Sequence, residues 1–225
     1  QFSVSANGIL QLGGTAVSST TYVSSSGTTT LPIFGALTSD AITASSADGG
    51  GVFSKVVGTG SNRCLILQWV VYSYYLNTSS PATFQIRLYE TTGAVEYVYG
   101  SMPVGATSYS SNYTTGFSVG STSNTFASIT TSSNSVSYST FSTNAYSAGT
   151  NITNLHSTAN GSRRVYTFTP PTPSSGPSNL SITSVTTTGM TLNWTAASPT
   201  TNVVRYVVFN STNGGTSYNF VSNVA

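Results

Sequence analysis

Apolar side chains along this chain recur mainly at every second residue, which is the spacing of a β-strand and not of a helix. The longest example covers residues 63–75, where Leu65, Leu67, Trp69 and Val71 alternate with a second, largely apolar set. A strand that is apolar on both sides is typical of the centre of a sheet that is covered on both faces. The pattern therefore predicts an all-β fold with residues 63–75 as a central strand.

Turn residues connect further pairs of predicted strands. Residues 83–90 alternate apolar and polar side chains, a Thr-Thr-Gly turn follows, and residues 94–99 return, which together predict a β-hairpin. Asn7-Gly8 lies between two short apolar stretches and is a strong signal for a two-residue hairpin loop. Residues 104–162 are rich in Ser, Thr, Asn and Gly with isolated aromatic residues, so we expect short strands joined by long loops there.

A proline-rich stretch, residues 170–177, marks the clearest domain boundary in the chain. Proline cannot donate to a sheet and favours an extended, semi-rigid backbone. The expected organisation is a jelly-roll-like antiparallel β-sandwich over residues 1–169, a linker over 170–177 and a smaller β domain over 178–225. Further strands are expected in that last part around Leu180, Leu192, residues 203–209 and residues 218–221.

Charged residues are rare in this chain. Six Lys+Arg and four Asp+Glu make up 4% of the residues. The basic residues are scattered and form no stripe, which excludes nucleic acid as an expected partner. The longest apolar run, residues 64–72, is far shorter than the ~20 residues of a membrane-spanning helix, so no membrane span is expected. A β-rich surface with so few charges tends to associate, which favours contacts between copies of the chain, or glycosylation.

The single cysteine, Cys64, cannot form a disulfide within the chain. We expect it to be a small buried core residue, with an intermolecular disulfide as the alternative. The chain begins directly with a predicted strand and not with a signal peptide, so we expect it to be mature or part of a longer protein.

The stretch after the linker resembles the start of a fibronectin type III domain. The resemblance rests on residues 177–180, 182–185 and 190–195, with Trp194 in the position of the family's core tryptophan, and on residues 206–209 as a third strand. It implies an immunoglobulin-like sandwich that is only partly present, because such domains have about 100 residues in seven strands. The remainder is expected either to lie outside this sequence or to be supplied by a partner strand.

Residues 1–170 resemble a β-sandwich module of large secreted Bacteroidetes surface proteins, and they are also similar to the nidogen-type extracellular domain. The motifs that carry this resemblance are residues 2–13, residues 62–69, the hairpin of residues 84–100 and the closing residues 166–170. The resemblance implies secreted adhesins, gliding-motility surface proteins or extracellular filaments. It contains no catalytic motif, and it implies that the chain begins within the domain.

Acid–base catalysis needs two suitably placed carboxylates, or a nucleophile with a base. Glu90 and Glu96 lie at opposite ends of the predicted hairpin, where we expect surface charges that face solvent or pair with Arg87. His156 is the only histidine and lies in a polar loop, so neither a catalytic triad nor a zinc site is expected. We therefore expect no enzyme activity and no catalytic residues.

Two kinds of ligand remain open in the sequence. Asp40 and Asp48 bracket a small-residue loop and are weak candidates for calcium, with a loop capped by Asp48 as the alternative. Tyr97 and Tyr99 are candidates for stacking on sugar rings, although packing within the sheet is the other interpretation. The Asn-x-Ser/Thr sequons expected to be available for glycosylation are Asn77, Asn112, Asn151 and Asn160.

These observations predict an extracellular, non-enzymatic structural or adhesive segment of a large secreted cell-surface protein or filament. Its expected partners are copies of itself or neighbouring domains, with glycans as a further possibility, and no cofactor is expected apart from the weak calcium candidates. The alternative function is a carbohydrate-binding module attached to a secreted enzyme.

Overall fold

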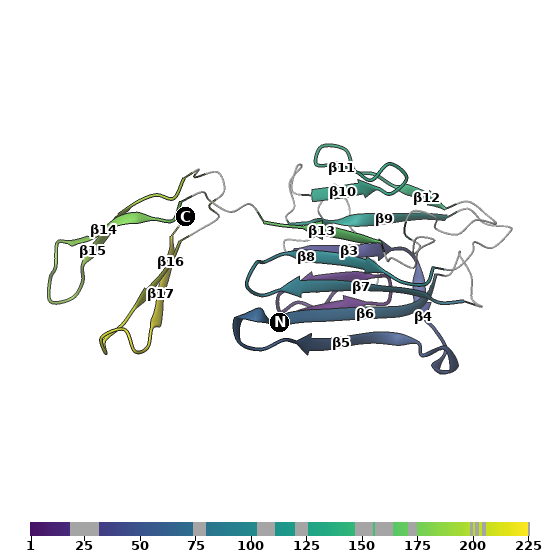
Figure 1. The fold of residues 1–225 in the computed structure, drawn as a ribbon, viewed down its shortest axis with the longest axis horizontal. Coiled ribbons are helices and arrows are strands. Elements are labelled where there is room, and N and C mark those ends of the chain that lie inside the picture. Colours follow the sequence, from purple (N-terminus) through teal and green to yellow (C-terminus); the bar gives the residue numbers. More distant parts are fainter. Residues whose placement is uncertain are drawn as a thin grey trace. The chain divides into compact units, whose positions relative to one another are not determined.

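The protein is described by a computed structural model in which two compact units, Gln1–Thr169 and Pro170–Ala225, can be distinguished (Figure 1). The described residues are 1–18, 32–73, 80–102, 111–119, 126–146, 155, 164–170, 175–198, 200, 203 and 206–224. Apart from the 3-10 turns Ser46–Asp48 (η1) and Gly60–Asn62 (η2) and a 3-10 position at Thr200, the regular structure of these residues is β-strand. The all-β fold class predicted from the alternation is confirmed. Among the described residues, no helix is long and apolar enough to cross a membrane.

The first unit is a sandwich of two antiparallel sheets. The first sheet has seven strands in the order β1-β2-β3-β9-β10-β11, with β12 paired to β9. The second sheet has six strands in the order β13-β8-β7-β6-β4, with β5 also paired to β6. The strand bounds are β1 Phe2–Ser5, β2 Ile9–Leu12, β3 Ile33–Thr38, β4 Ala41–Thr43, β5 Gly51–Val57, β6 Cys64–Ser73, β7 Ala82–Tyr89, β8 Val95–Tyr99, β9 Ser111–Ser118, β10 Phe126–Thr130, β11 Ser135–Ser137, β12 Asn144–Tyr146 and β13 Val165–Phe168.

The strand with apolar residues on both sides, β6, lies inside the second sheet, between β7 on one side and β4 and β5 on the other. The predicted hairpin is also present, because β7 pairs with β8 in a register that places Arg87 opposite Glu96. Its turn is closed by the Gly93 amide, which donates to the Tyr89 carbonyl at 2.9 Å. The hairpin and the central position of β6 are confirmed, and both rest on alternation within a short stretch of chain. The expected cover on both faces of β6 is only partial, because Ile66 and Gln68 on its outer face are half-buried.

Odd-numbered residues of β6 point into the sandwich and form its main core. Leu67, Trp69 and Val71 are buried together with their partners on β7 and with Tyr97 and Tyr99 of β8. The Trp69 ring stacks on Phe84 at 5.3 Å between ring centroids, and its indole N–H donates to the Ser5 carbonyl of the first sheet at 2.8 Å. Truncating a fully buried aromatic residue of this kind typically costs about 3–5 kcal/mol. Cys64 is free and buried, as expected.

The loop between β1 and β2 differs from the prediction by one residue. Ser5 is opposite Ile9, so Ala6, Asn7 and Gly8 form a three-residue loop and not the predicted two-residue one. The extra residue lets the Asn7 side chain accept a hydrogen bond from the Ala41 amide at 3.0 Å, which ties the first sheet to β4 of the second. A tertiary contact of this kind has no signature in the local sequence.

The second unit consists of two hairpins within its described residues. β14 (Ser178–Thr183) pairs with β15 (Thr191–Thr195), and β16 (Tyr206–Asn210) pairs with β17 (Asn219–Val224). The rings of Trp194 and Tyr206 meet edge to face at 5.4 Å. They line an open groove of about 410 Å³ together with apolar side chains such as Leu180 and Leu192.

Candidate functional site

The two tyrosines that the sequence left open as candidates for sugar stacking lie in the core of the first unit. Tyr97 and Tyr99 are both 0% exposed, so their rings cannot meet a glycan, and the other interpretation, packing within the sheet, is the one that the structure bears out. They point into the sandwich because β8 alternates them with Glu96 and Val98, which take the other face of the sheet.

Each of these phenols instead links the two sheets. The Tyr97 hydroxyl donates to the Gly116 carbonyl of β9, and the Tyr99 hydroxyl donates to the Ala36 carbonyl of β3. Burial raises the pKa of both phenols far above the ordinary tyrosine value, because an ionised phenolate would have no solvation there. Both side chains are therefore part of the framework that holds the sandwich together.

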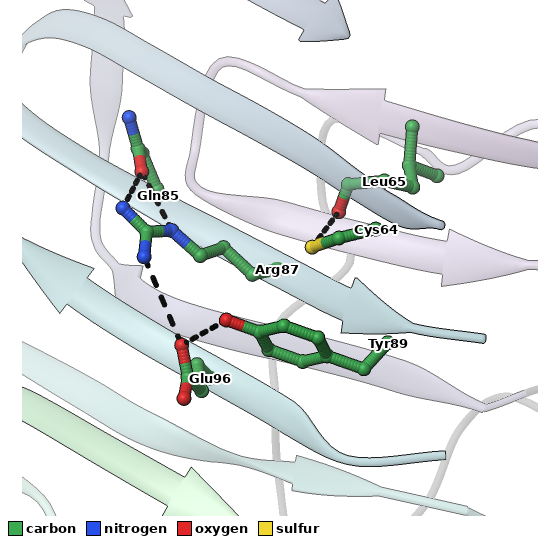
Figure 2. A network of polar contacts seen from close by, with 6 residues as sticks. All are labelled: Cys64, Leu65, Gln85, Arg87, Tyr89 and Glu96. Atoms are coloured by element: carbon green, nitrogen blue, oxygen red, sulfur yellow. Dashed lines mark hydrogen bonds and ion pairs between the residues drawn. The ribbon is translucent and has the colours of Figure 1, made fainter. Parts of the chain in front are cut away.

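The outer face of the second sheet, the face turned away from the core, carries the main polar network of the described residues (Figure 2). Arg87 lies at its centre and donates to the Gln85 side-chain oxygen from Nε at 3.0 Å and from a terminal nitrogen at 2.8 Å. Its other terminal nitrogen is 3.8 Å from the Glu96 carboxylate. Gln85 in turn donates to the side-chain oxygen of Gln68 on β6 at 2.7 Å. This ladder crosses three strands at the positions that the pleat turns away from the core.

Glu96 completes the network with a second donor, the Tyr89 hydroxyl, at 2.7 Å. The hydrogen bond to this carboxylate is the largest cause that raises the pKa of Tyr89, since a phenolate beside Glu96 would lose the bond and meet a like charge. Beside the network, burial raises the pKa of the Cys64 thiol. That shift makes Cys64 a poor nucleophile at neutral pH.

The second glutamate of the hairpin has a different partner. Glu90 accepts two hydrogen bonds from Arg63, each at 2.7 Å, and this contact lowers the pKa of the Glu90 carboxyl. The sequence left open whether either glutamate pairs with Arg87; Glu96 does so and Glu90 does not. Each carboxylate is thus held by an arginine on the protein surface.

The two calcium candidates, Asp48 and Asp40, have different surroundings. Asp48 accepts hydrogen bonds from the hydroxyls of Ser45 and Tyr72, which lower the pKa of its carboxyl. Ser45 also caps η1 by accepting from the Asp48 amide, so the loop is stabilised by local capping. Asp40 is exposed in the bend between β3 and β4. In the described part of the chain, no three His, Cys, Asp or Glu side chains gather into a metal site.

The glycosylation candidates are only partly visible. Asn112 lies on β9 with an exposed side chain, opposite Ala145 of β12. Asn77, Asn151 and Asn160 lie outside the described residues, as does His156. Their use as acceptors stays a prediction.

One surface feature was not predicted from the sequence, the edge strand β5. Its residues Phe53, Val56 and Val57 are exposed large hydrophobic side chains. The signal was present as a run of β-formers at residues 52–57, interrupted by Ser54 and Lys55. Glycines before the run and a lysine within it concealed the strand.

Comparison with known proteins identifies the first unit. A family model described as NIDO related matches residues 1–170. Neither the search of curated proteins nor that of solved structures found a significant match.

Proposed function

We propose that this chain, which belongs to the NIDO-related family, is a non-enzymatic segment of a secreted cell-surface protein or filament and works by joining copies of itself. Domains of this family are typical of extracellular adhesion modules and are usually extracellular. The resemblance to secreted surface proteins, and the very low charge of the chain, support the choice of self-contacts over contacts with an unrelated partner.

The observation that carries the proposal is the placement of the chemically active side chains. Arg63 and Glu90 hold each other, as do Arg87 and Glu96, and Asp48 is held by two hydroxyls. These groups stabilise the outer surface of a sandwich, whereas a catalytic acid or base must be able to reach a substrate. The buried tyrosines remove the residues on which a carbohydrate-binding role depended.

The second unit is proposed to be the first part of a fibronectin type III domain. In an immunoglobulin-like sandwich the first two strands and the third belong to opposite sheets. The hairpins β14-β15 and β16-β17 belong to separate sheets, and Trp194 and Tyr206 meet between β15 and β16. This arrangement is consistent with a spacer domain next to an adhesion module.

Bead clustering tests the proposed function. Beads coated with the full chain are expected to cluster with each other, while beads coated with an unrelated β-sandwich protein stay dispersed and do not join the clusters. Clustering should be undiminished by chelators and by free monosaccharides. Coated beads that stay dispersed at every coating density would refute the proposal.

A further inference from the structure

Among the described residues, the strand β5 lies at an edge of the second sheet. In the described residues it pairs with β6 alone, through seven register positions from Gly51–Val70 to Val57–Cys64 (Figure 1). The opposite edge of the strand therefore presents backbone N–H and C=O groups that can template another strand. Proteins commonly protect such edges with charges, prolines or bulges, and β5 has a single lysine, no proline and a continuous ladder.

The strand β5 exposes large apolar side chains to solvent. Phe53 is 50% exposed and Val56 is 58% exposed. The register with β6 places them on opposite faces, because Phe53 is opposite Gln68 on the outer face and Val56 is opposite Leu65 on the inner face. Apolar exposure on both faces of one edge strand points to an occupant that is itself a strand.

The sequence of β5 is complementary to its own antiparallel copy. When two copies pair about an axis through Ser54, residues whose numbers sum to 108 stand opposite each other. Val52 then faces Val56 of the second copy on the inner side, and Phe53 faces Lys55 of the second copy on the outer side. Apolar pairs and a cation over an aromatic ring both stabilise cross-strand neighbours.

The position of Lys55 disfavours one neighbouring register. Pairing centred on Lys55 would place the two lysines directly opposite each other, which is unfavourable. In the register centred on Ser54, the Lys55 ammonium group of each copy instead lies near the first half of the partner's β5. That half directly follows the loop that contains Asp48. That loop lies on the outer face, because the Asp48 carboxylate is bonded to Tyr72 of β6. The charges are therefore of opposite sign on the same face.

We propose that two copies of this chain join their second sheets edge to edge through antiparallel β5 strands, with Ser54 at the two-fold axis. This inference rests on the proposed function and names the surface and the partner for it. The axis is perpendicular to the sheet, so the core sides of the two sheets remain on the same side and the paired sheet has twelve strands, twice the six of one copy.

Disulfide trapping tests the register. In an antiparallel pair, opposite Cα atoms are about 4.5–5.5 Å apart, which a disulfide spans. Ser54→Cys is therefore expected to give a covalent dimer at least tenfold faster than Val56→Cys under mild oxidation. The Val56→Cys pair would be separated by four residues along the strand, about 13 Å, which is too far. The wild-type chain, with only buried Cys64, is the background. Equal trapping rates for the two variants would overturn the proposal.

A charge placed on the edge tests the surface in a second way. Val56→Lys adds a cation at an exposed position and is expected to abolish bead clustering. The matched control is Val136→Lys on β11, an exposed valine at the edge of the first sheet, which should leave clustering unchanged. If Val56→Lys beads cluster normally and Ser54→Cys is not trapped, the β5 interface is wrong and the proposed function stands. If wild-type beads do not cluster, the proposed function itself fails.

Discussion

The carbonyl of Ala36 gives the sharpest test of the claim that the buried tyrosines are structural. The ladder between β3 and β9 is interrupted between Gly35 and Thr38, so this carbonyl lies within an irregular part of the ladder. Two side chains donate to it, the Tyr99 hydroxyl from β8 and the Thr115 hydroxyl, at 3.0 Å, from β9. Removing one donor leaves the carbonyl satisfied, whereas removing both leaves a buried acceptor without a side-chain donor.

We expect the single variants Tyr99→Phe and Thr115→Val to lower the free energy of unfolding by about 1 kcal/mol each, the usual net value of a hydrogen bond. The double variant should lose about 1 kcal/mol more than the sum of the two, because an unsatisfied buried carbonyl costs about 1–3 kcal/mol. With a urea dependence of about 2 kcal/mol per molar, each single change moves the unfolding midpoint by about 0.5 M.

The assay is urea unfolding of the full chain followed by the fluorescence of Trp69, in a background with Trp194→Phe so that only the first unit reports. Tyr138→Phe is the control, because Tyr138 is exposed and its loss should leave the midpoint unchanged. Strictly additive effects in the double variant, or a stable Tyr99→Phe protein with no midpoint shift, would refute the bridging role.

Alkaline pH, two glycine substitutions and the loss of the Glu90 charge test other parts of the first unit. Stability should fall as the pH rises above about 10, where the tyrosines of the unfolded chain ionise. For Tyr113 this loss continues to about pH 12, because burial raises its pKa in the folded protein to about 12. Tyr113→Phe should therefore flatten the pH dependence of the unfolding midpoint in alkaline urea titrations. Gly8→Ala should destabilise the chain by more than 2 kcal/mol, since φ is +79° and a Cβ would lie 2.1 Å from the Leu37 carbonyl oxygen, whereas Gly49→Ala, with open space around it, should cost only about 1 kcal/mol in thermal unfolding. Glu90→Gln should leave bead clustering intact. In a polysaccharide screen we expect no hydrolytic activity from the wild-type chain or from this variant. A glycosidase activity that is present in the wild-type chain and lost in the variant would contradict the non-enzymatic proposal.

The parts of the fold that could be predicted from the sequence depend on neighbours along the chain. The hairpin β7-β8 and the central strand β6 follow from alternation and a Gly turn, which are local properties. The loop at Asn7 was one residue longer than predicted because its side chain is committed to the Ala41 amide, 34 residues away. Long-range contacts of this kind leave no mark in a short stretch of sequence.

In the candidate site, too, the sequence predicts local features but not those that depend on the assembled sheet. Alternation places Tyr97 and Tyr99 on one face of β8 and Glu96 on the other, but it does not by itself say which face is covered. The charge pair of Glu96 with Arg87 was the available signal, because partly exposed charges mark the outer face. The edge β5 was missed because edge position is a property of sheet order, which only the assembled sheet defines.

Sedimentation of the unmodified chain over a wide concentration range shows directly whether the chain self-associates. We expect the mass to rise with concentration from the monomer value of 23.3 kDa toward at least twice that value. The rise should persist at high salt, because the proposed contacts are mainly backbone pairing and apolar burial. A mass that stays at 23.3 kDa throughout would mean that the chain does not join copies of itself.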